Sequence, residues 1–122
     1  QRASALKLKG NEHYVAMRYN EAEIAYSGAL ELLQGVPHIS SEIAVLFSNR
    51  AGARLMVGKP MSALRDAMRS MELDPKFLRA VCRAATCHCR MGDFLAAQKL
   101  LDRVLDRVAP SNSSYQDLYK KL

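Results

Sequence analysis

A repeat of 34 residues is the feature of this sequence that most constrains its fold. Gly58 and Gly92 are separated by 34 residues, whereas Ala22 and Ala63 are separated by 41, which is one period plus seven. An insertion of seven residues at 37–43 accounts for the difference, and removing it brings three units into phase. A period of this length, made of helical patterns, predicts helix pairs that stack one on another.

Each unit contains two segments whose apolar residues recur at helical spacing. We expect helices at about 3–17, 20–33, 40–57, 61–73, 76–91 and 94–108, and a last helix at about 113–122 that would cover the end of the stack. Asn20 followed by Glu23 predicts a capping box at the start of the second helix.

The predicted fold is all-α, a superhelical stack of three helix pairs plus a C-terminal capping helix. We expect one domain over residues 1–122, because a chain of this length fits a single core. The three repeats are expected at about 3–36, 44–77 and 78–111, with the insertion at 37–43 between the first two.

Composition and charge narrow the classes of function. The chain is 49% hydrophobic, enough for a folded core, and its net charge of +6 favours an acidic partner. No apolar run approaches the roughly 20 residues that span a bilayer, and no dense Lys/Arg block indicates nucleic-acid binding. Three cysteines close together do not form a disulfide framework, so we expect reduced thiols in a cytoplasmic protein. The N-terminus lacks a signal region, and we expect a piece of a larger multidomain protein.

Five polar residues are expected to line one groove. Lys7 and Asn11 are four residues apart on the first helix of the first pair, and Arg79 and Arg83 are four apart on the first helix of the third pair. Asn49 lies on the equivalent helix of the middle pair. Because the first helices of stacked pairs line the concave side, these side chains should form one strip. Three cations and two amides suit a ligand with closely spaced carboxylates.

Three segments of the sequence carry a resemblance to a known family. Leu6–Glu12, Leu46–Ala51 and Leu78–Ala84 resemble the signature segments of carboxylate-clamp tetratricopeptide repeat (TPR) domains, which occur in co-chaperones of heat shock proteins 70 and 90. The resemblance covers nearly the whole chain. Within the family, the segment 41–97 is most similar to plant J-domain co-chaperones that carry tetratricopeptide repeats.

The resemblance implies a ligand and a role for each of the five residues. Lys7, Asn11 and Asn49 would hold the terminal carboxylate of a Glu-Glu-Val-Asp tail of heat shock protein 90, heat shock protein 70 or both. Arg79 and Arg83 would hold the aspartate side chain and the preceding backbone or glutamate. The family commonly has lysine at the position of Arg79, so the charge is kept while its geometry changes.

Two further residues are candidates for the groove. Tyr14 lies one turn beyond Asn11 and could form an apolar wall for the valine of the tail, or it could serve only in packing between repeats. In the family, an aromatic residue at this phase resembles domains that prefer heat shock protein 90. Met56 lies beyond Asn49 and is a second apolar candidate.

Other chemistry has weaker support in the sequence. Cys82 and Cys89 could share a helix face, but Cys87 would point elsewhere, and no second distant pair completes a zinc site. We therefore expect no metal and no cofactor. Cys82 lies beside two arginines, and redox control of binding is a hypothesis that alkylation would test.

No constellation of residues supports catalysis, because the three histidines lie on different elements and none is paired with a nucleophile or carboxylate in a recognisable motif. We expect a peptide-binding module, not an enzyme. The alternative is a general interaction scaffold that binds another acidic partner through the same groove.

Overall fold

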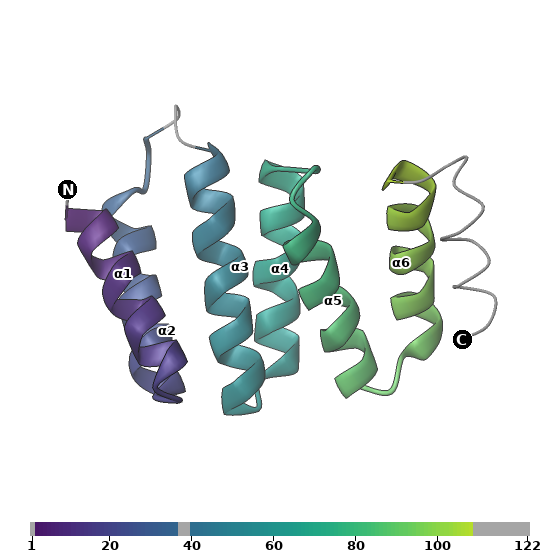
Figure 1. Ribbon diagram of the computed structural model, residues 1–122, viewed down its shortest axis with the longest axis horizontal. Helices are drawn as coiled ribbons and strands as arrows, with labels where there is room; N and C mark the ends of the chain where they lie inside the picture. Colours follow the sequence, from purple (N-terminus) through teal and green to yellow (C-terminus); the bar gives the residue numbers. More distant parts are fainter. Residues whose placement is uncertain (1, 37–39, 109–122) are drawn as a thin grey trace.

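The computed structural model describes residues 2–36 and 40–108, and in this part of the chain it contains six α-helices and no strand (Figure 1). The helices are α1 (Arg2–Val15), α2 (Tyr19–Leu32), α3 (Ser40–Val57), α4 (Pro60–Leu73), α5 (Leu78–Arg90) and α6 (Phe94–Val108). Each helix packs against the next, and α3 also packs against α5. Figure 1 shows α1, α3 and α5 on one side of the row, with α2 and α4 behind them. The prediction of an all-α helical repeat is confirmed.

The helix expected at about 113–122 lies outside the described residues. The limits of the single domain and of its three repeats stay predictions. None of the described helices has the length and apolar character needed to cross a membrane.

The same turn ends the first helix of each pair, and it explains the spacing of the repeat. Gly58 and Gly92 have φ angles of +92° and +82°, in the left-handed region where glycine is favoured. Met17, with a φ of +62°, holds the equivalent place in the first pair, 41 residues before Gly58. In every case the next residue donates a hydrogen bond from its backbone N–H to the carbonyl oxygen five residues before it, and the N···O distance is 2.8 Å. The first turn therefore accepts a non-glycine residue in a strained conformation.

Two helix starts differ from the sequence prediction. The capping box at Asn20 is wrong: α2 begins at Tyr19, and Arg18 precedes it without a side-chain cap. Glu23 instead accepts hydrogen bonds from Arg54 and Lys59. Its carboxylate forms tertiary ion pairs and does not cap the start of α2.

The start of α5 also differs, because it lies at Leu78 and not near residue 76. The Asp74 side chain accepts a hydrogen bond from the backbone N–H of Lys76 at 3.2 Å. This local bond holds the segment in a turn and delays the helix by two residues.

Small residues fill the core where helices approach closely. Six small residues that recur in the repeats are buried: Gly10, Ala51, Ala85, Ala22, Ala63 and Ala97. Two core clusters result, one around Ala22, Tyr26 and Leu46, and one around Ala63, Val81 and Leu100. A larger side chain at the alanines would force the helices apart.

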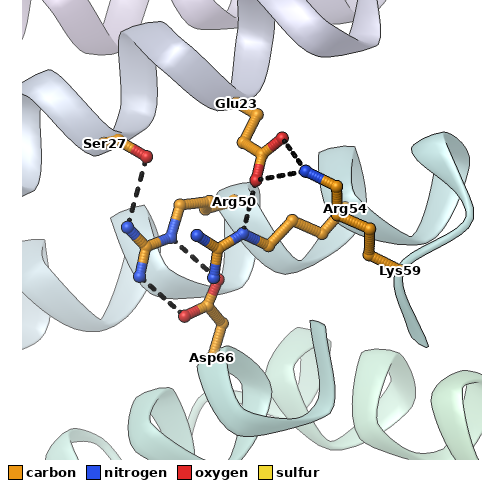
Figure 2. A network of polar contacts seen from close by, with 6 residues as sticks. All are labelled: Glu23, Ser27, Arg50, Arg54, Lys59 and Asp66. Carbon is orange, nitrogen blue, oxygen red and sulfur yellow. Dashed lines mark hydrogen bonds and ion pairs between the residues drawn. The ribbon is translucent and has the colours of Figure 1, made fainter. Parts of the chain in front are cut away.

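A network of ion pairs joins α2, α3 and α4 (Figure 2). Arg50 binds both carboxylate oxygens of Asp66 at 2.8 Å, and Arg54 reaches Asp66 at 2.9 Å and Glu23 at 2.7 Å. Lys59 completes the network through Glu23 at 3.1 Å. Burial alone would raise the pKa of Glu23, but the hydrogen bonds from Arg54 and Lys59 outweigh it and lower the pKa below its ordinary value. The network fixes the orientation of α3, and with it the residues on the opposite face of that helix.

Candidate functional site

The structure brings six of the seven candidate residues, all but Met56, to one cavity of about 360 Å³. Its lining contains Lys7, Asn11 and Tyr14 from α1, Asn49 from α3, and Arg79 and Arg83 from α5, together with Val15, Tyr26 and Val45. These helices are the first members of the three pairs, which Figure 1 shows on the same side of the row. The predicted strip is therefore a real groove. We call this cavity the polar groove.

The cations of the polar groove are not neutralised by the described part of the chain. Within residues 2–36 and 40–108, no acidic side chain pairs with Lys7, Arg79 or Arg83. By contrast, Arg50 and Arg54, on the other side of α3, are both paired with Asp66. Three uncompensated positive charges around one cavity favour an anionic ligand.

Tyr26 fixes the amide of Asn11. The Tyr26 hydroxyl donates a hydrogen bond to Oδ1 of Asn11 at 2.6 Å, and Nδ2 of Asn49 lies 3.5 Å from the same oxygen. Because both neighbours donate to the carbonyl oxygen, Nδ2 of Asn11 is left as a donor for a ligand. Asn49 is itself 9% exposed, so its amide is held within the wall of the groove.

The protonation state of Tyr26 suits this role. Burial raises the pKa of its phenol to about 12, and the nearby charge of Arg83 opposes this shift without cancelling it. Only the protonated hydroxyl can donate to Asn11, and it is protonated at neutral pH.

Tyr26 is the site residue that the sequence analysis missed. The helical pattern places it on a buried face but does not show which side chain its hydroxyl reaches. The glycine at position 10 is the one sequence feature that relates to this contact. A Cβ atom at Gly10 would lie 2.5 Å from the ring of Tyr26. A glycine directly before Asn11 therefore makes room for the ring that orients the amide.

The structure places Tyr14 between the polar groove and the core of the first two repeats. It lines the polar groove, and its ring lies 5.9 Å from the guanidinium carbon of Arg83. It also packs edge-on against Tyr19 at 5.3 Å and contacts the core between the first two pairs. The ring thus gives the groove a rigid apolar side.

A second cavity of about 270 Å³ adjoins the polar groove and shares Tyr14, Arg79 and Arg83 with it. Met56 and the exposed Cys82 line this second cavity and not the first. Both residues therefore lie beside the polar groove, beyond Tyr14, Arg79 and Arg83.

A larger cavity of about 550 Å³ lies between α2, α3 and α4, but its chemistry is different. Its two arginines already have acidic partners: Arg50 pairs with Asp66, and Arg69 pairs with Glu72 at 3.0 Å. The smaller polar groove is the better anion site because its cations are unpaired.

The cysteines are free thiols. Cys87 is fully buried, and burial raises the pKa of its thiol to about 11, which makes it a poor nucleophile. Among the described residues, no group of three or more His, Cys, Asp or Glu side chains is placed to hold a metal ion.

Two solved domains share this architecture. The first TPR of Spaghetti (RPAP3), bound to the HSP90 peptide SRMEEVD, is 26% identical with a TM-score of 0.76, and the alignment covers 99% of this chain and 90% of that one. The TPR2B domain of yeast Sti1, in complex with pHsp70, is 27% identical with a TM-score of 0.75 over 94% of this chain and 89% of that one. The chain is a TPR domain. It resembles the TPR domains that bind HSP90 and HSP70 tails, as the three signature segments imply.

One curated relative shows how much of a protein this TPR domain represents. DnaJ homolog subfamily C member 7 of Mus musculus is 34% identical over 104 residues, which are 85% of this chain. The chain spans only 20% of that relative's length. No family model matches the chain. The narrower resemblance to plant J-domain proteins stays a prediction.

Proposed function

We propose that this TPR domain is a peptide-binding co-chaperone module that clamps the acidic C-terminal tail of HSP90, HSP70 or both. The observation that carries the proposal is the polar groove, where three unpaired cations and two oriented amides meet. The peptide in the similar RPAP3 domain ends in Glu-Glu-Val-Asp, whose side chains and terminus supply four carboxylates. The module is non-catalytic and cytoplasmic, and it belongs to a larger multidomain protein.

In this proposal, one end of the groove receives the end of the peptide chain. Lys7 supplies a point charge to the terminal carboxylate, and Asn11 and Asn49 donate from their amides. The hydrogen bond from Tyr26 orients Asn11 before the ligand arrives, which lowers the entropy that binding must overcome.

The other end of the groove receives the side chain of the aspartate that ends the peptide. Arg79 is exposed and Arg83 is half-buried, and each guanidinium can hold a carboxylate through two parallel N–H groups. Tyr14 forms the apolar wall against which the valine packs. Charge-assisted hydrogen bonds contribute about 1.5–3 kcal/mol each, and the ordering of a flexible tail offsets part of this gain. We expect a dissociation constant of about a micromolar.

A matched pair of variants on α1 tests the proposal. Lys7 lines the polar groove, whereas Lys9, two residues along, is exposed and lies outside it. Titration of SRMEEVD by calorimetry should show an affinity loss of at least about tenfold for Lys7→Ala, the equivalent of one charge-assisted bond. Lys9→Ala should bind as the wild type does. Equal losses in the two variants would show that net charge, and not the groove, attracts the peptide.

The alternative is a scaffold that binds another acidic partner through the same groove. Such a scaffold would recognise internal or folded acidic segments and would not require a free chain terminus. Nucleic acid is not the proposed partner, and binding to it would show a steep dependence on salt with several phosphate contacts.

A further inference from the structure

Gly52, in the middle of α3, packs against the charged end of Arg83 and lines the second cavity with it. A Cβ atom built at Gly52 would lie 2.5 Å from Cζ and 3.0 Å from Nη2 of Arg83. Real Cβ atoms essentially never lie closer than 3.0 Å to another heavy atom, so the guanidinium occupies the space that a side chain at position 52 would fill. Gly52 is also buried within an 18-residue helix, where glycine costs about 0.5–1 kcal/mol relative to alanine.

Packing, and not hydrogen bonding, holds Arg83 in this place. On one side its guanidinium lies over the ring of Tyr14 at 5.9 Å, and on the other it rests against Gly52. Its Nε atom is buried and has no hydrogen-bond partner among the described residues, which is unfavourable by itself. Since no hydrogen bond from residues 2–36 or 40–108 fixes the guanidinium, a small steric change at position 52 is enough to move it.

Arg83 also stands where two cavities meet, because it lines both the polar groove and the second cavity beyond it. Any shift of its guanidinium therefore changes the shape and the charge of the groove at that junction. Neighbouring positions on α3 do not have this influence, because Ala51 and Ala53 are fully buried in the two core clusters.

We infer that Gly52 is a positioning residue for ligand binding: it sets the depth at which Arg83 presents its charge in the groove. This inference rests on the proposed function. Gly52 touches no ligand atom itself. The absence of a side chain allows the guanidinium to lie against the backbone of α3, within reach of Tyr14.

The test is Gly52→Ala, measured in a cycle with Arg83→Ala. The alanine should displace the guanidinium and weaken SRMEEVD binding by about three- to tenfold, part of the value of one charge-assisted bond. The variant should be no less stable to heat, because alanine favours helix and the displaced atoms are the end of a flexible chain. In the Arg83→Ala background the same change should have no effect on affinity.

Gly28→Ala is the matched control. Gly28 also lies inside a helix, and a Cβ there would meet only the end of Leu6, at 3.3 Å, outside the groove. Its affinity should equal that of the wild type. The inference is overturned if Gly52→Ala binds as the wild type does, or if it weakens binding equally with and without Arg83.

A readout without ligand separates this inference from the proposed function. In the wild type, the buried Nε–H of Arg83 should exchange slowly with solvent in ¹⁵N NMR spectra, and in Gly52→Ala it should exchange at the rate of an exposed arginine. Arg83→Ala identifies the resonance. If the wild type does not bind the peptide but this difference is observed, the proposed function fails and the positioning of Arg83 stands. If exchange is the same in both proteins, the positioning fails whatever the binding result.

Discussion

Replacing Tyr26 with phenylalanine should weaken both the fold and the site. The change removes one hydroxyl, whose hydrogen bond to Oδ1 of Asn11 is 2.6 Å long, and leaves the 2%-exposed ring in place. A buried hydrogen bond of this kind contributes about 0.5–1.5 kcal/mol net. We expect the free energy of unfolding to fall by about 1 kcal/mol, measured by urea denaturation followed by circular dichroism.

The same substitution should reduce peptide affinity although Tyr26 lies behind the amide that would meet the ligand. Without the hydroxyl, the 3.5 Å contact from Asn49 is the one remaining bond from the described residues to Oδ1 of Asn11. The amide can then rotate, and ordering it on binding costs about 0.5–1.5 kcal/mol. The dissociation constant should rise by about two- to tenfold in calorimetric titration.

The pH dependence of stability gives this prediction a second signature. Because the folded-state pKa of Tyr26 is raised from its ordinary 10 to about 12, the protonated phenol is favoured in the fold. Its contribution is fully present below pH 10 and is lost as the pH rises through 12. Cys87 behaves in the same way between its ordinary pKa of 9 and about 11. The free energy of unfolding should therefore fall less for Tyr26→Phe than for the wild type as the pH rises above 10. The difference in stability between the two proteins should be smaller there than at pH 7.

Tyr19→Phe is the control, because the Tyr19 ring packs against Tyr14 but its hydroxyl makes no hydrogen bond with the described residues. It should change neither stability nor affinity. If Tyr26→Phe matches the wild type in stability, affinity and alkaline unfolding, the oriented amide of Asn11 is refuted.

Two further predictions concern the scaffold. Met17→Gly should stabilise the protein by up to about 1 kcal/mol, because Met17 is 74% exposed and adopts a φ of +62°. Gly58→Ala should destabilise the protein, because Gly58 has a φ of +92°. Opposite shifts in the two melting temperatures would show that the first turn is not strained. Asp66→Asn should lower the free energy of unfolding by about 3 kcal/mol, because it leaves Arg50 and Arg54 without their shared carboxylate. Glu72→Gln, in an exposed pair, should lower it by under about 0.5 kcal/mol in the same denaturation assay. Similar losses in the two variants would contradict the importance of the network in Figure 2.

The fold and the outline of the site could be predicted because both follow from the period of the repeat. One turn geometry recurs at Met17, Gly58 and Gly92, so the positions of these residues determine the spacing of the helices. Equivalent positions on successive first helices then face the same side. Lys7, Asn49 and Arg83 could be placed together without knowledge of any side-chain contact.

Contacts between side chains from different helices could not be predicted in this way. The bond from Tyr26 to Asn11 and the packing of Arg83 on Gly52 depend on atomic distances across helices, which no period encodes. The failed capping box has the same origin, because Glu23 is taken by Arg54, which is 31 residues away in the sequence. Local patterns predicted the elements, and tertiary contacts decided how particular polar groups are used.

Titration with one peptide in two chemical forms tests the central claim most directly. SRMEEVD with a free terminal carboxylate should bind with a dissociation constant of about a micromolar, and the C-terminally amidated peptide should lose most of that affinity, at least about tenfold. The reason is that Lys7, Asn11 and Asn49 would lose the charged group they are arranged to receive. Equal affinity for the two forms would contradict the clamp and favour a scaffold that recognises acidic side chains alone.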